Sequence, residues 1–283
     1  MNRILPLIIF MVLVSCSNYG QLTFITKLPK KLDENSGIVA LEDNKIWVIE
    51  DNGNTDELFE VDFEGHLIKK FKVTNAKNKD WEDLAKDDKG NVYIADIGNN
   101  GNTRKQLVIY KVPDPTKEKG DKIAARKIYF SYPGQKKFPP KSKDFKYDAE
   151  ALFYKDDNLY LITKNKSRPF KGDAQIYKIP AQPGEHKARL LGSITLCENA
   201  AKCIVTSATI SSDNQKVVLL GYGMLWIITD FKDDDFTNGK ITSIDLGTST
   251  QLESVCFKND STLLLSDERR HGKGRNLYSF KIK

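Results

Sequence analysis

The chain has 283 residues, and its 44 Lys and Arg against 38 Asp and Glu give a formal net charge of +6 at pH 7. Hydrophobic residues make up 40% and the mean hydropathy is −0.47, which excludes a multi-pass membrane protein and a disordered chain alike. Acidic residues are almost as numerous as basic ones, so the charge is diluted along the chain and we expect no nucleic acid as a partner.

The N-terminal residues predict export from the cell. Arg3 supplies a short basic region, and the segment Ile4–Val14 that follows is apolar apart from Pro6. An apolar segment of this length is too short to span a bilayer as a helix, so it indicates a signal peptide. We therefore leave these residues out of the fold prediction.

The run Leu13-Val14-Ser15-Cys16 resembles the lipobox of bacterial lipoproteins, in which the thiol is acylated and the chain is cut before it. The resemblance implies a signal peptide over 1–15, a short tether over 16–20 and a membrane anchor at Cys16. Ser17 provides no acidic retention signal, so we expect a lipid-anchored protein of the bacterial cell envelope, in the outer membrane. An ordinary signal peptide with a chance cysteine is the alternative.

One unit of three strands recurs five times along the chain. Each copy has a small or acidic residue opening a strand, a polar turn, a second hydrophobic strand that ends in polar residues, and a third strand. The opening residue precedes the end of the second strand by fourteen residues in four copies and by thirteen in the third copy. Such constant spacing predicts repeated antiparallel hairpins. The opening residues are Ser36, Glu82, Glu150, Ser207 and Glu253.

A fourth strand follows in four of the copies. The expected fourth strands are Leu67–Val73, Ala125–Tyr132, Ala188–Leu196 and Lys240–Leu246. The fifth copy lacks one, and the alternating segment Gln21–Leu28 before the first copy can take its place. We therefore predict an all-β fold, a five-bladed β-propeller over residues 21–283 that is closed by the N-terminal strand. A β-sandwich would show less regular spacing.

A six-bladed propeller is the alternative, and it would need another blade inside Val112–Tyr147. That segment contains five prolines and one clear strand, so we interpret it as an outer strand plus a decorated loop. Lysines cluster in this loop, and we interpret them as a solvated insertion rather than a polyanion site. They are Lys136, Lys137, Lys141, Lys143 and Lys146.

The cysteines fit an oxidising compartment. Cys197 and Cys203 bracket a short polar segment, and we expect them to form a disulfide. Cys256 lies in an apolar run and is expected to be buried. The three histidines are scattered away from this pair, so a zinc site is not predicted.

The five opening residues should converge on the propeller axis at one mouth of the central channel. Three carboxylates in a narrow channel repel one another, and a hard divalent cation would relieve that repulsion. Calcium accepts several carboxylate and hydroxyl oxygens in flexible geometry. We therefore expect Ca²⁺ as a cofactor at Ser36, Glu82, Glu150, Ser207 and Glu253, with carboxylates that only cap backbone amides as the alternative.

This order of residues resembles the axial site of the calcium-activated apyrases, which are five-bladed nucleotidases with calcium on the axis. The runs Asn35–Ile38, Trp81–Ala85 and Asp148–Leu152 are similar to those of the SdiA-regulated and phytase-like esterase propellers. The resemblance implies a metal-binding propeller, and it places no apyrase substrate-binding residue on this chain.

Loops after the second strands should lie on the same face as the metal site. They carry charged residues that suit an anionic small molecule, with solvated loops as the alternative. These ligand-binding candidates are Asp51, Asp96, Arg104, Lys164, Arg168, Asp267, Arg269, Arg270 and His271.

Two functions remain open at this point. We favour a lipid-anchored, monomeric binding or scaffold module with a calcium site, which binds an anionic small molecule or a protein partner. The alternative is a calcium-dependent phosphoesterase or nucleotidase that uses the same channel mouth. The chain has neither a Gly-rich phosphate loop nor a Gly-x-Ser-x-Gly motif, and its catalytic residues, if any, are unknown.

Overall fold

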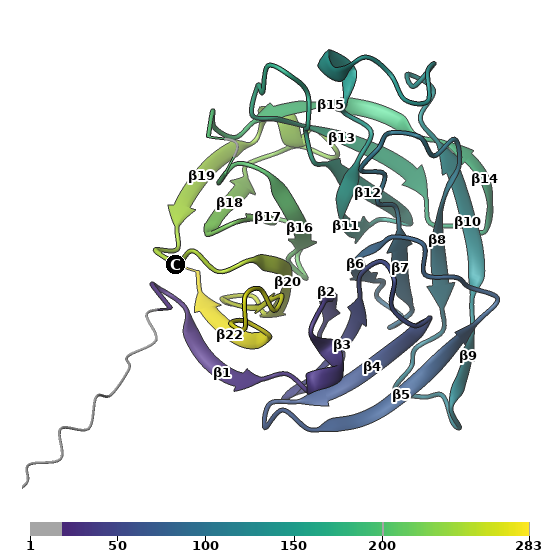
Figure 1. Cartoon of the computed structure of the whole chain (residues 1–283), viewed down its shortest axis with the longest axis vertical. Coiled ribbons are helices and arrows are strands. Elements are labelled where there is room, and N and C mark those ends of the chain that lie inside the picture. Colours follow the sequence, from purple (N-terminus) through teal and green to yellow (C-terminus); the bar gives the residue numbers. More distant parts are fainter. Residues whose placement is uncertain (1–18, 200, 283) are drawn as a thin grey trace, which may run out of the picture.

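Five β-sheets stand around a common axis in the computed structural model, which describes residues 19–199 and 201–282 (Figure 1). Each sheet has a core of four antiparallel strands, with the first strand nearest the axis and the fourth towards the rim. This arrangement is a five-bladed β-propeller, so the predicted fold class is confirmed and the six-bladed alternative is wrong.

The blades take their main strands as follows. Blade 1 contains β2 (Asn35–Val39), β3 (Lys45–Glu50), β4 (Glu57–Asp62) and β5 (Leu67–Thr74). Blade 2 contains β6 (Trp81–Lys86), β7 (Val92–Asp96), β8 (Leu107–Val112) and β10 (Arg126–Ser131). Blade 3 contains β11 (Ala149–Lys155), β12 (Asn158–Thr163), β13 (Asp173–Pro180) and β15 (Arg189–Thr195). Blade 4 contains β16 (Val205–Ile210), β17 (Val217–Gly221), β18 (Met224–Thr229) and β19 (Lys240–Asp245).

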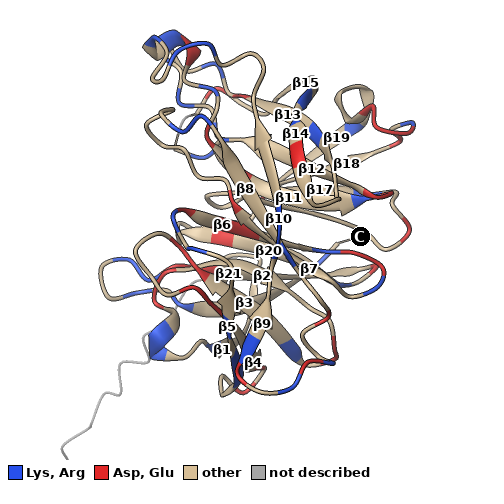
Figure 2. Cartoon of the chain, turned by 90° about the vertical axis from the view of Figure 1, so that its right-hand side faces the viewer, with Lys and Arg blue, Asp and Glu red and all other residues tan. Residues whose placement is uncertain are grey.

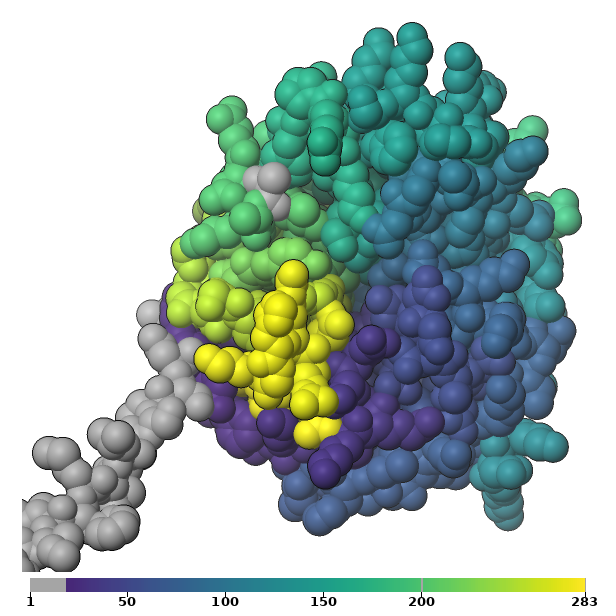
Figure 3. All heavy atoms as spheres, in the orientation of Figure 1, coloured from purple at the N-terminus to yellow at the C-terminus, as the bar shows by residue number. Residues whose placement is uncertain are grey.

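The ring closes between the two ends of the chain. Blade 5 contains β20 (Leu252–Asn259), β21 (Thr262–Asp267) and β22 (Asn276–Lys281), and its outer strand is the N-terminal β1 (Thr23–Lys27), which pairs antiparallel with β22. In the space-filling view the yellow C-terminal residues lie beside the purple N-terminal ones (Figure 3). The predicted closing strand is therefore confirmed, and it is shorter than Gln21–Leu28.

Two further strands extend the rim in a way that the sequence did not predict. β9 (Lys122–Ala124) pairs parallel with β5 of blade 1, and β14 (Gly184–Lys187) pairs parallel with β10 of blade 2. The segment Val112–Tyr147 thus holds two strands, β9 and β10, and the expectation of one outer strand was wrong. Short 3₁₀ helices complete the elements: η1 (Lys30–Leu32), η2 (Ser142–Asp144) and η3 (Phe236–Asn238).

The core lies between neighbouring blades. Side chains alternate along each strand, so the two faces of every sheet pack against the sheets on either side. Large aromatic residues fill these layers, and Trp47, Trp81 and Trp226 are almost fully buried. Charged residues concentrate in the loops and along the outer strands (Figure 2). The ring is thus held together mainly by apolar contacts between blades.

A disulfide joins Cys197 and Cys203, whose Cα atoms are 5.5 Å apart, and Cys256 is a buried free cysteine. Among the described residues, no helix has the length and apolar character that crossing a membrane requires. The predicted signal peptide and the acylation site at Cys16 lie outside the described residues.

Candidate functional site

A β-bulge at the start of each inner strand shapes the channel mouth. In blade 2, for example, Trp81 pairs with Asp96 and Asp83 pairs with Ala95, which leaves Glu82 between them without a partner residue. A bulge of this kind turns the unpaired side chain out of the regular alternation. The bulged residues are Ser36, Glu82, Glu150, Thr206 and Glu253.

In four blades the predicted opening residue is the bulged residue. In blade 4 the predicted residue lies one position after the bulge. There the bulge falls between Val205 and Ser207, so Thr206 occupies the position that the repeat assigned to Ser207. A slip of one residue along a strand moves a side chain to a different face. Ser207 consequently lies one level deeper in the channel than the other four residues.

That deeper level is closed by a hydrogen-bond network around Asp83. Its fully buried carboxylate accepts hydrogen bonds from the backbone N–H of Leu84 at 2.9 Å, Leu152 at 2.9 Å and Ala208 at 3.2 Å. It also accepts from the Ser207 hydroxyl at 3.1 Å. One side chain thus links blades 2, 3 and 4 at the axis. Sequence reasoning missed Asp83 because the bulge places it, rather than Glu82, on the axis.

Above this network lies a group of three carboxylates. Asp51, Asp80 and Glu82 each place a carboxylate oxygen within 4.8 Å of the others. Burial raises the pKa of Asp80 to about 6. Burial also raises the pKa of Glu82 well above its ordinary value, and the negative charges of Glu150 and Asp51 raise it further. We call these three residues the acidic cluster.

Gly98 borders the acidic cluster and leaves room for it. A Cβ atom at this position would overlap the carboxylates of Glu82 and Asp80. Asp80 is held there by its backbone carbonyl, which accepts the Gly98 N–H at 3.2 Å. The absence of a side chain at Gly98 therefore lets these two carboxylates lie against its backbone.

A lysine lies beside the other two predicted glutamates at this mouth. The Lys164 ammonium lies 2.9 Å from the Glu150 carboxylate. Burial raises the pKa of Glu150 to about 7 and that of Glu253 to about 8, and the positive charge of Lys164 opposes both shifts. The three predicted glutamates thus share one mouth, but two of them face a cation that the protein itself supplies.

The predicted serine ligands already have partners within the chain. The Ser36 hydroxyl donates to the backbone carbonyl of Glu82, and the Ser207 hydroxyl donates to Asp83. The metal role predicted for these serines stays untested, and their hydroxyl groups are engaged in contacts between blades.

Sequence reasoning also missed Asp80 and Asp148. Both precede a bulged glutamate by two residues, in Asp80-Trp81-Glu82 and Asp148-Ala149-Glu150. The repeated Asp-x-Glu pattern was the signal that could have found them. The buried Asp148 carboxylate accepts the Asn99 N–H at 2.7 Å and lies 2.9 Å from the Lys166 ammonium.

The loop residues predicted to bind an anion do not converge on one site. Asp96 forms an ion pair with Arg104 at 2.8 Å. Asp267 is fully buried and accepts from the Asn276 N–H at 2.7 Å and the Tyr278 hydroxyl at 2.8 Å. These three side chains stabilise their own loops and have little freedom to bind a ligand.

The remaining candidates lie at the surface. Arg269 pairs with Asp33 at 2.7 Å, and Arg270 donates to the Gln251 side chain at 3.0 Å. Arg168 and His271 are exposed, and no side-chain partner is found for them in the described parts of the chain. The acidic cluster and Lys164, with Glu150 and Glu253, therefore form the chemically distinctive part of this face.

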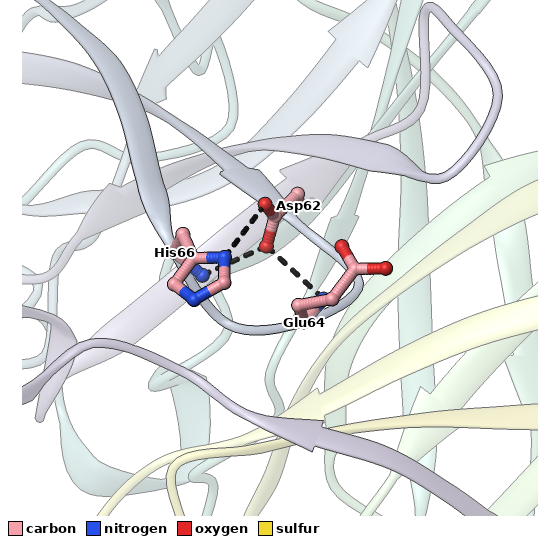
Figure 4. A group of neighbouring side chains, drawn as sticks. All are labelled: Asp62, Glu64 and His66. Atoms are coloured by element: carbon pink, nitrogen blue, oxygen red, sulfur yellow. Dashed lines mark hydrogen bonds and ion pairs between the residues drawn. The ribbon is translucent and has the colours of Figure 1, made fainter.

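A second group of possible metal ligands is better explained as a turn. Asp62, Glu64 and His66 lie in the hairpin between β4 and β5 (Figure 4). The Asp62 carboxylate accepts the backbone N–H of Glu64 at 3.0 Å and of His66 at 2.8 Å, and it contacts the His66 ring at 3.0 Å. Its oxygens thus stabilise the turn itself.

The opposite mouth of the channel opens into a cavity of about 670 Å³. The ends of all five inner strands line it, and none of the predicted site residues does. Its wall is apolar near Leu84 and Leu152, and its lining also includes several lysines and aspartates. The Asp83 network lies between this cavity and the acidic cluster.

The fold is shared with solved structures of very different sequence. No protein-family model matches the chain, and no curated protein matches its sequence. The PQQ-bound aldose sugar dehydrogenase of Streptomyces coelicolor superposes with a TM-score of 0.53 at 12% identity, covering 92% of this chain and 98% of the dehydrogenase. A protein of unknown function from Bacteroides thetaiotaomicron superposes with a TM-score of 0.51 at 10% identity, covering 93% of this chain and 76% of its own.

These comparisons define the class of the molecule as a β-propeller. At such low identity the likeness extends to the fold alone. Neither structure bears the name of an apyrase or a phytase-like esterase, so that finer resemblance gains no support from them.

Proposed function

We propose that this chain is an exported binding propeller whose acidic cluster holds one calcium ion. The observation that carries the proposal is the convergence of Asp51, Asp80 and Glu82 within 4.8 Å at the channel mouth. Three carboxylates this close, all with a pKa that burial raises, are costly to ionise without a counter-charge. A divalent cation would supply that charge.

The donor set fits calcium. All three groups offer carboxylate oxygens, which hard cations prefer, and the cluster contains no nitrogen or sulfur ligand of the kind that zinc favours. Gly98 allows two of the three carboxylates, those of Glu82 and Asp80, to approach its backbone closely. Bound calcium would act here as a fixed positive charge that holds loops of blades 1 and 2 together.

This proposal moves the predicted ion away from the axis. Glu82 remains a ligand, whereas Glu150 and Glu253 face Lys164. Asp51 and Asp80 replace Ser36, Glu150, Ser207 and Glu253 as the proposed ligands. The ammonium of Lys164 thus supplies the neutralising charge at the axis itself.

We further propose that acylation of Cys16 anchors the propeller in the cell envelope, at the outer membrane, where it binds other molecules as a monomer. The Leu-Val-Ser-Cys run supports the anchor. The cavity of about 670 Å³ at the opposite mouth supports a binding role, because its size suits a small molecule.

A calcium-dependent phosphoesterase is the second candidate, and it has weaker support. Substrate phosphate would need cations near the metal, but those at the mouth already pair with carboxylates. Arg104 pairs with Asp96, Lys164 with Glu150 and Lys166 with Asp148. Phosphate release from a nucleoside diphosphate that disappears in Glu82→Gln would establish this activity.

Calcium binding can be tested by calorimetry and thermal melting of the chain with calcium, magnesium or chelator. Calcium at a hundredfold excess over its dissociation constant should stabilise the fold by about 2.7 kcal/mol. Asp80→Asn should greatly reduce this response. Glu64→Gln is the matched control, because it removes a carboxylate from the exposed turn beside β5. Identical melting with calcium and chelator, with no binding heat, would refute the proposal.

A further inference from the structure

The lysine-rich loop between β10 and β11 covers residues 132–148 and joins blade 2 to blade 3. It lies on the same face as the acidic cluster, because β11 begins at that mouth. Figure 1 shows its short helix η2 at the top of the ring, and Figure 2 shows blue segments along the same projecting loop. The sequence alone suggested that its lysines are simply solvated.

The loop is attached to its surroundings by several hydrogen bonds. The Gln135 side chain donates to the carbonyl of Asn102 at 2.7 Å, and the Tyr147 N–H donates to the side chain of the same asparagine at 3.0 Å. Farther along, the backbone N–H of Arg168 donates to Ser142 at 3.1 Å. The loop therefore has a defined shape that its own sequence does not reveal.

That shape borders an open hollow of about 470 Å³. Four lysines border it, together with Gly134, Pro140, Asp144 and Tyr147. The lysines are Lys136, Lys137, Lys141 and Lys143. All four are exposed, and none forms an ion pair with a carboxylate among the described residues. By contrast, Lys146 of the same loop faces Asp173 at 3.7 Å.

Four unpaired ammonium groups around one concavity repel one another, and a single nearby carboxylate, that of Asp144, offsets only part of the charge. Anions should therefore collect in the hollow. Flexible lysine stems can bring their charges onto the separate oxygens of a compact polyanion. An anion with several closely spaced negative charges fits this arrangement better than a single carboxylate does.

We propose that this hollow, the lysine pocket, binds a ligand with two or more phosphate groups. The volume of the pocket suits a small polyphosphorylated molecule or the phosphate-bearing part of a lipid headgroup. Binding there uses none of the residues of the acidic cluster, so it is independent of the calcium proposal.

The test uses the full-length chain and inorganic tripolyphosphate, with binding measured by calorimetry at low salt. EDTA is present throughout, so that chelation of metal by tripolyphosphate adds no heat. The double variant Lys137→Gln/Lys141→Gln should bind roughly tenfold more weakly, because it removes two ammonium–phosphate contacts. The control Lys27→Gln/Lys187→Gln removes the same charge from exposed strand positions that have no ion-pair partner, and it should bind like the wild type.

Vesicles that contain cardiolipin, whose headgroup carries two phosphates, and vesicles of phosphatidylcholine alone distinguish the two sources of phosphate. Cosedimentation with the cardiolipin vesicles only, weakened in the pocket variant and reversed by tripolyphosphate, would identify a lipid headgroup as the ligand. Tripolyphosphate binding without such cosedimentation would identify a free phosphorylated molecule. The proposal is overturned if the pocket variant binds tripolyphosphate as tightly as the control variant, or if neither the wild type nor the control binds it.

Discussion

The carboxyl group of Glu253 should make the propeller less stable as the pH rises. It lies at the bulge of β20, where the Gln251 side chain donates to it at 2.7 Å. Burial raises its pKa from 4.5 to about 8, and the charge of Glu150 adds to the shift. The folded protein therefore retains a proton that the unfolded chain releases.

The sign of the effect follows from proton linkage. Because the folded pKa lies above the unfolded one, the stabilisation is fully present below pH 4.5 and is lost as the pH rises through about 8. The upper limit is about 5 kcal/mol, at about 1.36 kcal/mol for each pH unit between the two values. We expect about 2–3 kcal/mol, because the side chain is partly exposed and water screens its charge.

The test uses the substitution Glu253→Gln. Glutamine has nearly the same shape as glutamate, and its side chain is uncharged at every pH. Urea unfolding of wild type and variant, in chelator, would be measured from pH 5 to pH 9. The wild type should lose stability relative to the variant across this range. Glu64→Gln, in the exposed turn, should leave the pH profile unchanged. Parallel profiles for wild type and Glu253→Gln would refute the reasoning.

Three further predictions concern other parts of the chain. Asp83→Ala leaves several buried N–H groups without an acceptor, so urea unfolding should show a loss of about 3 kcal/mol or more, and a loss below about 1 kcal/mol would contradict the axial network. Replacing Cys197 and Cys203 by serine should lower stability by about 2 kcal/mol, and free thiols in unreduced wild type would argue against the bond. Mass spectrometry should find the mature chain beginning at an acylated Cys16, whereas an unmodified N-terminus would contradict the anchor.

The architecture was predictable because it rests on a local pattern. Each hairpin places its apolar residues within about fifteen positions of one another, so spacing alone identified the blades. The rim strands were not predictable in this way. β9 contacts β5 across about fifty residues of chain, and β14 contacts β10 across about the same distance, so no local signal marks these pairings.

The candidate site was predictable in part for a related reason. Glu82, Glu150 and Glu253 share a position in the repeat, and the structure brings them to one mouth. What the repeat did not reveal is how each blade differs at that position. Lys164 and Asp51 follow equivalent second strands but carry opposite charges, so the mouth holds a cation beside Glu150 and a further carboxylate beside Glu82.

Because of the two rim strands, some neighbouring blades are joined by backbone hydrogen bonds and others are not. β9 leaves blade 2 to pair with blade 1, and β14 leaves blade 3 to pair with blade 2, so backbone hydrogen bonds connect three consecutive blades at their outer edges (Figure 1). Within the described residues, no strand pairing connects blade 3 to blade 4. Blades 1 to 3 should therefore exchange their amide hydrogens as one cooperative unit, whereas blade 4 can separate at its seam with blade 3 by losing side-chain contacts alone.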